Sequence, residues 1–197
     1  MNKQIKFANC RYFSWLVIFI EWLMILLLFI LFKLSIDMPI SQVTALGTNL
    51  SIKLITRTGV IIATSSFYLF SLYLDNFWER SSITSIIGGL SMALAMFIPY
   101  NQGLVLSLSH NLLALVALMS YTFVMVKVSN SSSLNQRFRT LTRIIIFSIL
   151  FSLSLILAHI LGLGLLGSRK YVFALTEMII LALVHIWMIS ISIKKFN

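Results

Sequence analysis

The sequence predicts an all-α integral membrane protein, a bundle of six transmembrane helices with both termini in the cytoplasm. Of its 197 residues, 59% are hydrophobic and only 10% are charged, and the mean hydropathy is +1.00. Apolar runs long enough to cross a bilayer recur from one end of the chain to the other. Helices are expected because they satisfy their own backbone hydrogen bonds in lipid. We therefore expect a single transmembrane domain over residues 1–197.

The lengths of the apolar runs and the positions of helix breakers place the six spans. The first run is too long for the core of a signal peptide, so we expect it to be retained as an anchor. The predicted spans are Phe13–Leu34, Arg57–Leu74, Ile83–Ile98, Leu104–Val126, Leu141–Leu163 and Tyr171–Ile193.

Lysine and arginine residues are distributed unequally between the two sides of these spans. Ten of the fifteen fall in the N-terminal segment, the second-to-third turn, the fourth-to-fifth loop and the C-terminal segment. Cytoplasmic loops carry the excess of positive charge, so this side is predicted to be cytoplasmic.

A net charge of +10 would suggest nucleic-acid binding in a soluble domain. Here the basic residues lie at span ends beside membrane lipids, which argues against nucleic acid. We expect a multi-pass protein of a prokaryotic plasma or inner membrane.

The predicted cytoplasmic loop 127–143 reads "KVSNSSSLNQRFRTLTR" and contains no acidic residue. Its serine and asparagine content predicts a flexible linker that touches anionic lipid. A docking site for a protein partner is the alternative.

Small residues four apart predict close helix contacts, because tight backbone approach drives helix association in lipid. Span three has Ser85, Gly89 and Ala93, and span five has Ser154, Ala158 and Gly162. These faces could pack within one bundle or between two copies, so the oligomeric state stays open.

Ionisable residues at membrane depth are candidate functional groups. His110 and Glu177 each lie about 9 Å from the outer end of their spans, and His159 is close to the same level. These three side chains could form an outer pocket for a lipid headgroup, a small ligand or a partner. Together they are also the only predicted set that could converge on a metal or, through the two histidines, a haem. The chain has no HExxH or HxxxH pair, so we predict neither metal nor cofactor.

Glu21 and His185 form a second candidate pair, each about 12 Å from the cytoplasmic end of its span. A carboxylate and an imidazole at matched depth could join by a hydrogen bond or an ion pair. Such a pair could simply lock the first and last helices together, or it could relay protons.

The chain also resembles a known family in three segments. They are the glycine-containing third span "IIGGLSMALAMFIP", the histidine about eleven residues after its proline, and the glutamate in "ALTEMIILALVHIW". This combination resembles the six-span membrane proteins known as domain of unknown function 998, which are distantly similar to the damage-regulated autophagy modulators. The resemblance spans about residues 13–193 and implies the same six-span architecture. It adds Ser41 and Pro99 to His110 and Glu177 as candidate ligand-binding positions.

Three functions fit these features, and the first is favoured. It is a non-enzymatic membrane protein with the outer polar pocket. The second is a component of small-solute transport, although span one lacks the small-residue docking face of vitamin-binding transporter subunits. The third is an intramembrane hydrolase, for which Ser107, three residues before His110, is a better candidate nucleophile than the adjacent Ser109.

Overall fold

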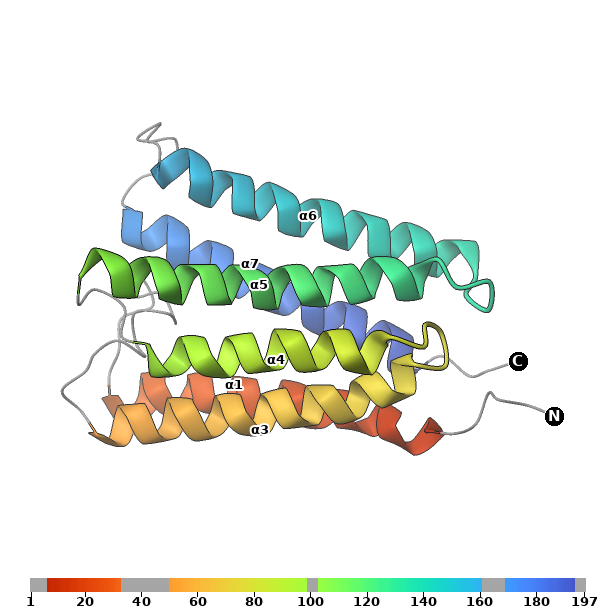
Figure 1. The fold of residues 1–197 in the computed structure, drawn as a ribbon, viewed down its shortest axis with the longest axis horizontal. Helices are drawn as coiled ribbons and strands as arrows, with labels where there is room; N and C mark the ends of the chain where they lie inside the picture. The colour runs from red at the N-terminus through yellow and green to blue at the C-terminus, as the bar shows by residue number, and fades with distance from the viewer. Residues whose placement is uncertain (1–6, 33–49, 99–102, 161–168, 194–197) are drawn as a thin grey trace.

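The computed structural model describes residues 7–32, 50–98, 103–160 and 169–193, and nearly all of these residues are helical. The predicted all-α fold is confirmed: within these described ranges, six α-helices run side by side along the longest axis (Figure 1). A short 3-10 helix, η2 (Ala8–Tyr12), precedes the first. The six are α1 (Phe13–Phe32), α3 (Leu50–Leu74), α4 (Ser81–Phe97), α5 (Leu104–Ser129), α6 (Gln136–Ile160) and α7 (Arg169–Ser192).

Five of these helices are long and apolar enough to cross a membrane, and α4 is a shorter apolar helix of 17 residues. The start of α1 and the end of α7 lie at the same end of the bundle, together with the α3–α4 and α5–α6 turns (Figure 1). We call this the inner end and the opposite one the outer end. The arrangement agrees with six spans that begin and end on one side.

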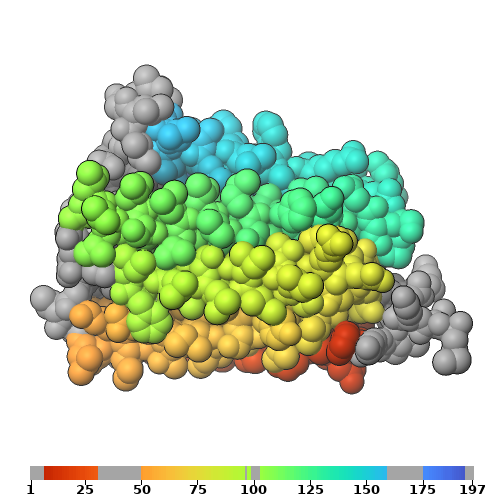
Figure 2. All heavy atoms as spheres, viewed as in Figure 1, coloured from red at the N-terminus to blue at the C-terminus, as the bar shows by residue number. Residues whose placement is uncertain are grey.

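The surface of the bundle is apolar, as lipid contact requires. Figure 2 shows the face formed by α3, α4 and α5, with α6 beside them. Large exposed apolar side chains on α4 and α5 include Leu90, Leu94, Phe97, Leu112, Leu115 and Met119. In water this much exposed apolar surface would cause aggregation, so the described helices belong in a membrane.

Two predicted boundaries are corrected by the structure. Helix α3 begins at Leu50 and not at Arg57, and α6 begins at Gln136 and not at Leu141. Apolar length marks only the hydrocarbon-crossing part of a helix, whereas the backbone continues as helix into the polar headgroup layer. The extra turns of α3 are supported by Thr56 Oγ1, which donates to the carbonyl of Ile52 at 2.8 Å.

The loop 127–143 is not the flexible linker that its composition predicted. Helix α5 continues to Ser129, and the turn to α6 spans only residues 130–135. Asn135 Oδ1 accepts a hydrogen bond from the Phe138 amide at 2.9 Å, which caps the start of α6. Across the turn, Arg139 Nη2 donates to the carbonyl of Ser131 at 2.8 Å. Asparagine and serine therefore act here as turn and capping residues.

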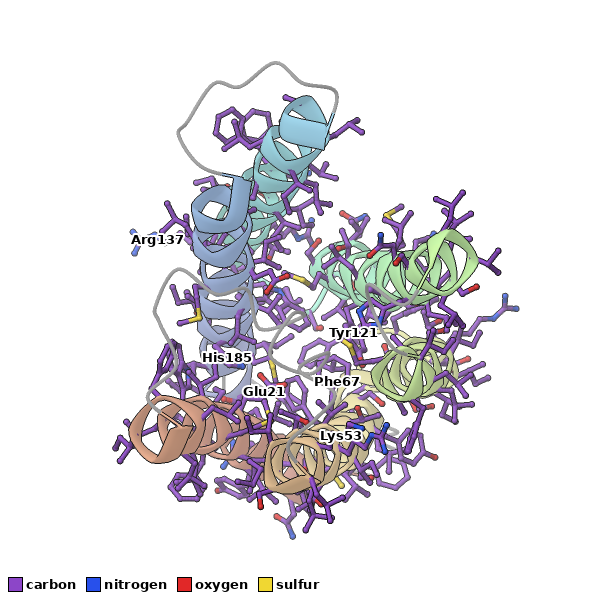
Figure 3. All side chains as sticks on the ribbon, turned by 90° about the vertical axis from the view of Figure 1, so that its left-hand side faces the viewer. Glu21, Lys53, Phe67, Tyr121, Arg137 and His185 are labelled. Carbon is purple, nitrogen blue, oxygen red and sulfur yellow. The ribbon has the colours of Figure 1, made fainter. Side chains whose placement is uncertain are left out.

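The densest packing lies near the inner end. The main core cluster draws on the inner halves of all the helices except α4, and its fully buried members include Phe70, Tyr73, Val124, Met125, Trp187 and Met188. In the outer half, a smaller cluster joins only α1 and α3, through Met24, Leu28 and Ile52. Helices α5 and α6 also diverge toward the outer end (Figures 1 and 3). The bundle is therefore firmly packed inside and looser outside.

The small-residue face predicted on α4 makes the close contact expected of it. A Cβ placed on Gly89 would lie 2.5 Å from Thr64 Cγ2 of α3, so only glycine allows this approach. Ser85, one turn earlier, is also buried. On the corresponding face of α6, Ser154 is exposed and donates to the carbonyl of Phe151 on its own helix, so it makes no close contact within the bundle. Gly162 lies outside the described residues.

Candidate functional site: a polar cluster at membrane depth

Helices α1 and α7 are joined by a carboxylate–imidazole pair within the bundle. His185 Nε2 lies 2.6 Å from Glu21 Oε2, which is a short hydrogen bond of the charge-assisted kind. Glu21 follows the first residue of α1 by eight positions, and His185 precedes the last residue of α7 by seven. Both groups therefore lie about 10–12 Å along their helices from the inner end. The structure brings together the two residues that their depth had suggested.

A third side chain completes this cluster. The indole Nε1 of Trp22 donates to His185 Nδ1 at 3.1 Å, so both nitrogens of the imidazole have a partner on α1. The Trp22 and His185 rings are 6.2 Å apart between centroids and tilted by 58°. Sequence reasoning missed Trp22. The available signal was an indole N–H next to an acidic residue in the middle of an apolar helix, far from the headgroups where tryptophan usually lies.

The three side chains differ in their exposure. The His185 side chain is 5% exposed and that of Glu21 is 24% exposed, while Trp22 is 39% exposed on the lipid-facing side of α1. An ionisable group in hydrocarbon is unfavourable unless it is paired or neutralised. The pairing explains how the bundle tolerates both groups at this depth.

Tyr121 of α5 faces the same interior region. Figure 3 shows Glu21, His185, Tyr121 and Phe67 pointing toward the middle of the bundle from four helices. The Tyr121 and Phe67 rings pack with centroids 4.5 Å apart. Tyr121 thus adds a phenol to the side chains that face this region.

Two further hydrogen bonds hold α7 to its neighbours nearer the inner end. Trp187 Nε1 donates to Thr142 Oγ1 of α6 at 3.1 Å. Tyr73 of α3 donates through its hydroxyl to the backbone carbonyl of Ile191 at 3.1 Å. Both bonds are buried. Helix α7 is therefore fixed by polar contacts to α1, α3 and α6, and its contact to α1 joins a carboxylate to an imidazole.

His110 of the predicted outer pocket is buried, and it contacts the end of α4. Its Nδ1 lies 2.9 Å from the carbonyl oxygen of Ala95 and 3.1 Å from that of Ile98. The Ala95 carbonyl also accepts from the Ile98 amide at 3.1 Å. His110 gives the carbonyls at this helix end a further donor. This contact ties the second turn of α5 to the last turn of α4.

The other predicted outer positions are less fully described. Glu177 is partly buried on α7. Ser41, Pro99 and the side chain of His159 lie outside the described residues. Ser107 and Ser109 are partly buried in the first two turns of α5. Among the side chains that the structure describes, no three histidine, cysteine, aspartate or glutamate residues are close enough to hold a metal ion.

Comparisons of the chain with protein-family models, with curated proteins and with solved structures find no match. The resemblance to domain of unknown function 998 therefore stays a prediction. The candidate site rests on its own geometry, and its defining feature is the Trp22–His185–Glu21 cluster.

Proposed function

We propose that this integral membrane protein is a component of proton-linked transport of a small solute, with Glu21 and His185 as its proton-binding site. One observation carries the proposal, namely the 2.6 Å contact between a carboxylate and an imidazole at membrane depth. Ionisable residues inside transmembrane bundles typically mark ion and proton pathways, because their burial is unfavourable and needs a compensating use.

The position of the pair in the bundle supports transport over a purely structural lock. The pair joins α1, which packs on α3, to α7, which packs on α6. It lies at the outer edge of the dense inner core, where packing gives way to the looser outer half. A change in protonation at this junction alters the attraction between two parts of the bundle. That is the kind of local electrostatic change that can shift a two-state membrane protein.

The partial exposure of Glu21 is also in keeping with this function. A carboxylate whose only role is to lock two helices together is best fully buried, because a low dielectric strengthens its attraction to the imidazole. The Glu21 side chain is 24% exposed, against 5% for His185. A proton can therefore reach Glu21 more readily than it can reach the imidazole.

Proton flux into sealed liposomes tests the proposal. The protein is reconstituted into liposomes that contain a pH-sensitive dye, and a pH gradient is imposed. A small-molecule extract of the expressing cells supplies the candidate solutes. We expect extract-dependent dissipation of the gradient by the wild-type protein and its loss in Glu21→Gln, which keeps the side-chain shape and removes the charge.

Asp75→Asn is the matched control, because Asp75 lies in the α3–α4 turn and accepts a hydrogen bond from the Ser82 amide at 2.9 Å. It makes the same acid-to-amide change outside the site and should leave the flux unchanged. If wild-type liposomes behave like empty ones, the protein is not a proton-linked transporter. If folded Glu21→Gln keeps the full flux, the pair only locks α1 to α7.

A further inference from the structure

We propose that Trp22 is a positioning residue that holds His185 in its neutral, Nε2-protonated form, so that Glu21 is the group that takes up and releases the proton. This inference deepens the proposed function and rests on it for the role of that proton. It is carried by the two hydrogen bonds that flank one imidazole ring: Trp22 Nε1 to His185 Nδ1 at 3.1 Å and His185 Nε2 to Glu21 Oε2 at 2.6 Å.

The indole nitrogen decides the position of the histidine proton. A tryptophan N–H can only donate, so His185 Nδ1 must accept with its lone pair. A neutral imidazole carries one proton, and with Nδ1 unprotonated that proton is on Nε2. The short contact to Glu21 is therefore a donation from His185 Nε2–H to the carboxylate oxygen. The indole on one side thus fixes the direction of the hydrogen bond on the other.

The same geometry decides where an added proton goes. An imidazolium carries N–H groups on both nitrogens, which would set Nδ1–H against the indole N–H at 3.1 Å. Protonation of His185 therefore requires the Trp22 bond to break. A proton from water can instead bind a lone pair on Glu21 Oε1, which turns the anionic carboxylate into a neutral acid. Both hydrogen bonds of His185 survive this step, and the pair loses its charge inside the hydrocarbon.

A protonated Glu21 that donates from Oε2 back to the imidazole is excluded by the same argument. It needs an unprotonated Nε2, which moves the histidine proton to Nδ1 and again opposes the indole N–H. Among the described residues, the titratable groups that face His185 are Glu21 on α1 and Tyr121 on α5 (Figure 3). Tyr121 is neutral when protonated, so it supplies no positive charge that would compete with His185 for the carboxylate.

Nitrogen-15 NMR of histidine-labelled protein tests this assignment directly, because the two neutral forms and the imidazolium have distinct ring-nitrogen shifts. The chain has only three histidines, and the spectrum of His185→Gln identifies the His185 signals. His110 provides an internal reference of the opposite kind, since its Nδ1 faces two carbonyl oxygens and must carry the proton. We expect His185 to show a protonated Nε2 and an unprotonated Nδ1.

Trp22→Phe removes the indole N–H and keeps an aromatic ring on the lipid-facing surface. In this variant we expect a shift of the His185 signals to a mixture of both neutral forms. Trp15→Phe is the matched control, two helical turns earlier on α1 and also exposed at 47%. It should leave the His185 signals in place. Infrared difference spectra against Glu21→Gln should show a protonated carboxyl band on acidification, while the His185 nitrogen shifts stay unchanged.

The proposal is overturned if wild-type His185 is protonated on Nδ1 or is an imidazolium. It is also overturned if Trp22→Phe leaves the signals unchanged or if acidification protonates the histidine first. None of these measurements depends on transport. If the spectra are as expected but the liposomes show no proton flux, the assignment of Trp22 and His185 stands and the transport function is refuted. If the liposomes show proton flux but His185 is protonated on Nδ1, the transport function stands and the role of Trp22 is refuted.

Discussion

Replacing Gly89 by alanine should destabilise the bundle by forcing α3 and α4 apart. The added Cβ would lie 2.5 Å from Thr64 Cγ2, whereas carbon atoms in contact are normally about 3.5–4.0 Å apart. The deficit is therefore about 1 Å. Thr64 cannot easily turn away, because β-branched side chains in helices are nearly confined to one or two rotamers. Overpacking of this kind costs about 1–3 kcal/mol.

Gly59→Ala is the matched control, because its added Cβ would also lie very close to a side chain, but to a flexible one. There the nearest atom is the Met24 sulfur at 2.6 Å. A methionine side chain is flexible enough to move aside, so we expect a cost below about 1 kcal/mol. Thr64→Ser removes the obstructing methyl group and should restore most of the stability of Gly89→Ala in the double variant.

The free energy of unfolding is measured by titrating SDS into detergent micelles and following helix content by circular dichroism. The wild type, the three single variants and the double variant are compared under identical conditions. The steric reasoning is refuted if Gly89→Ala and Gly59→Ala cost the same. It is also refuted if Thr64→Ser gives no restoration, because the coupling between the two sites would then be absent.

Two further predictions concern buried hydrogen bonds, and the same titration measures both. Thr142→Val should cost about 1–3 kcal/mol, because it leaves the buried Trp187 N–H without its acceptor. Trp187→Phe in that background should then cost less than it does alone, and additive costs would contradict the assigned bond. His110→Leu should cost about 1 kcal/mol, because the Ile98 carbonyl loses its His110 donor while the Ala95 carbonyl keeps the Ile98 amide. Amide exchange should accelerate in the last turn of α4 and stay unchanged at its start, and uniform acceleration would count against a local role.

Much of the fold follows from the apolar runs. Their lengths predicted six helices and which ends share a side, because hydrocarbon thickness fixes how many residues a span needs. The same criterion could not locate the ends of α3 and α6, whose outermost turns lie beyond the hydrocarbon. It also took residues 127–143 for a linker, since serine and asparagine can equally serve as caps and turn residues.

The sequence predicted how deep the residues of the candidate site lie in the membrane, but not the directions in which their side chains point. Counting residues placed Glu21 and His185 at one level, and the structure joins them. The role of Trp22 could not be predicted by counting residues. Helix α1 is apolar on all sides, so its sequence does not indicate which face points toward α7. His110 shows the same difficulty. Its depth suggested an outer pocket, whereas its ring nitrogen contacts the end of α4.

The shortness of α4 has a consequence for the surrounding bilayer. Its 17 residues rise about 25 Å, less than the roughly 30 Å of an average hydrocarbon layer. Its neighbours α3 and α5 have 25 and 26 residues. The lipid-facing stripe of Ile83, Ile87, Leu90 and Leu94 lies on this short helix. Hydrophobic mismatch should therefore thin the bilayer on one flank only, and favour a thinner membrane for this protein.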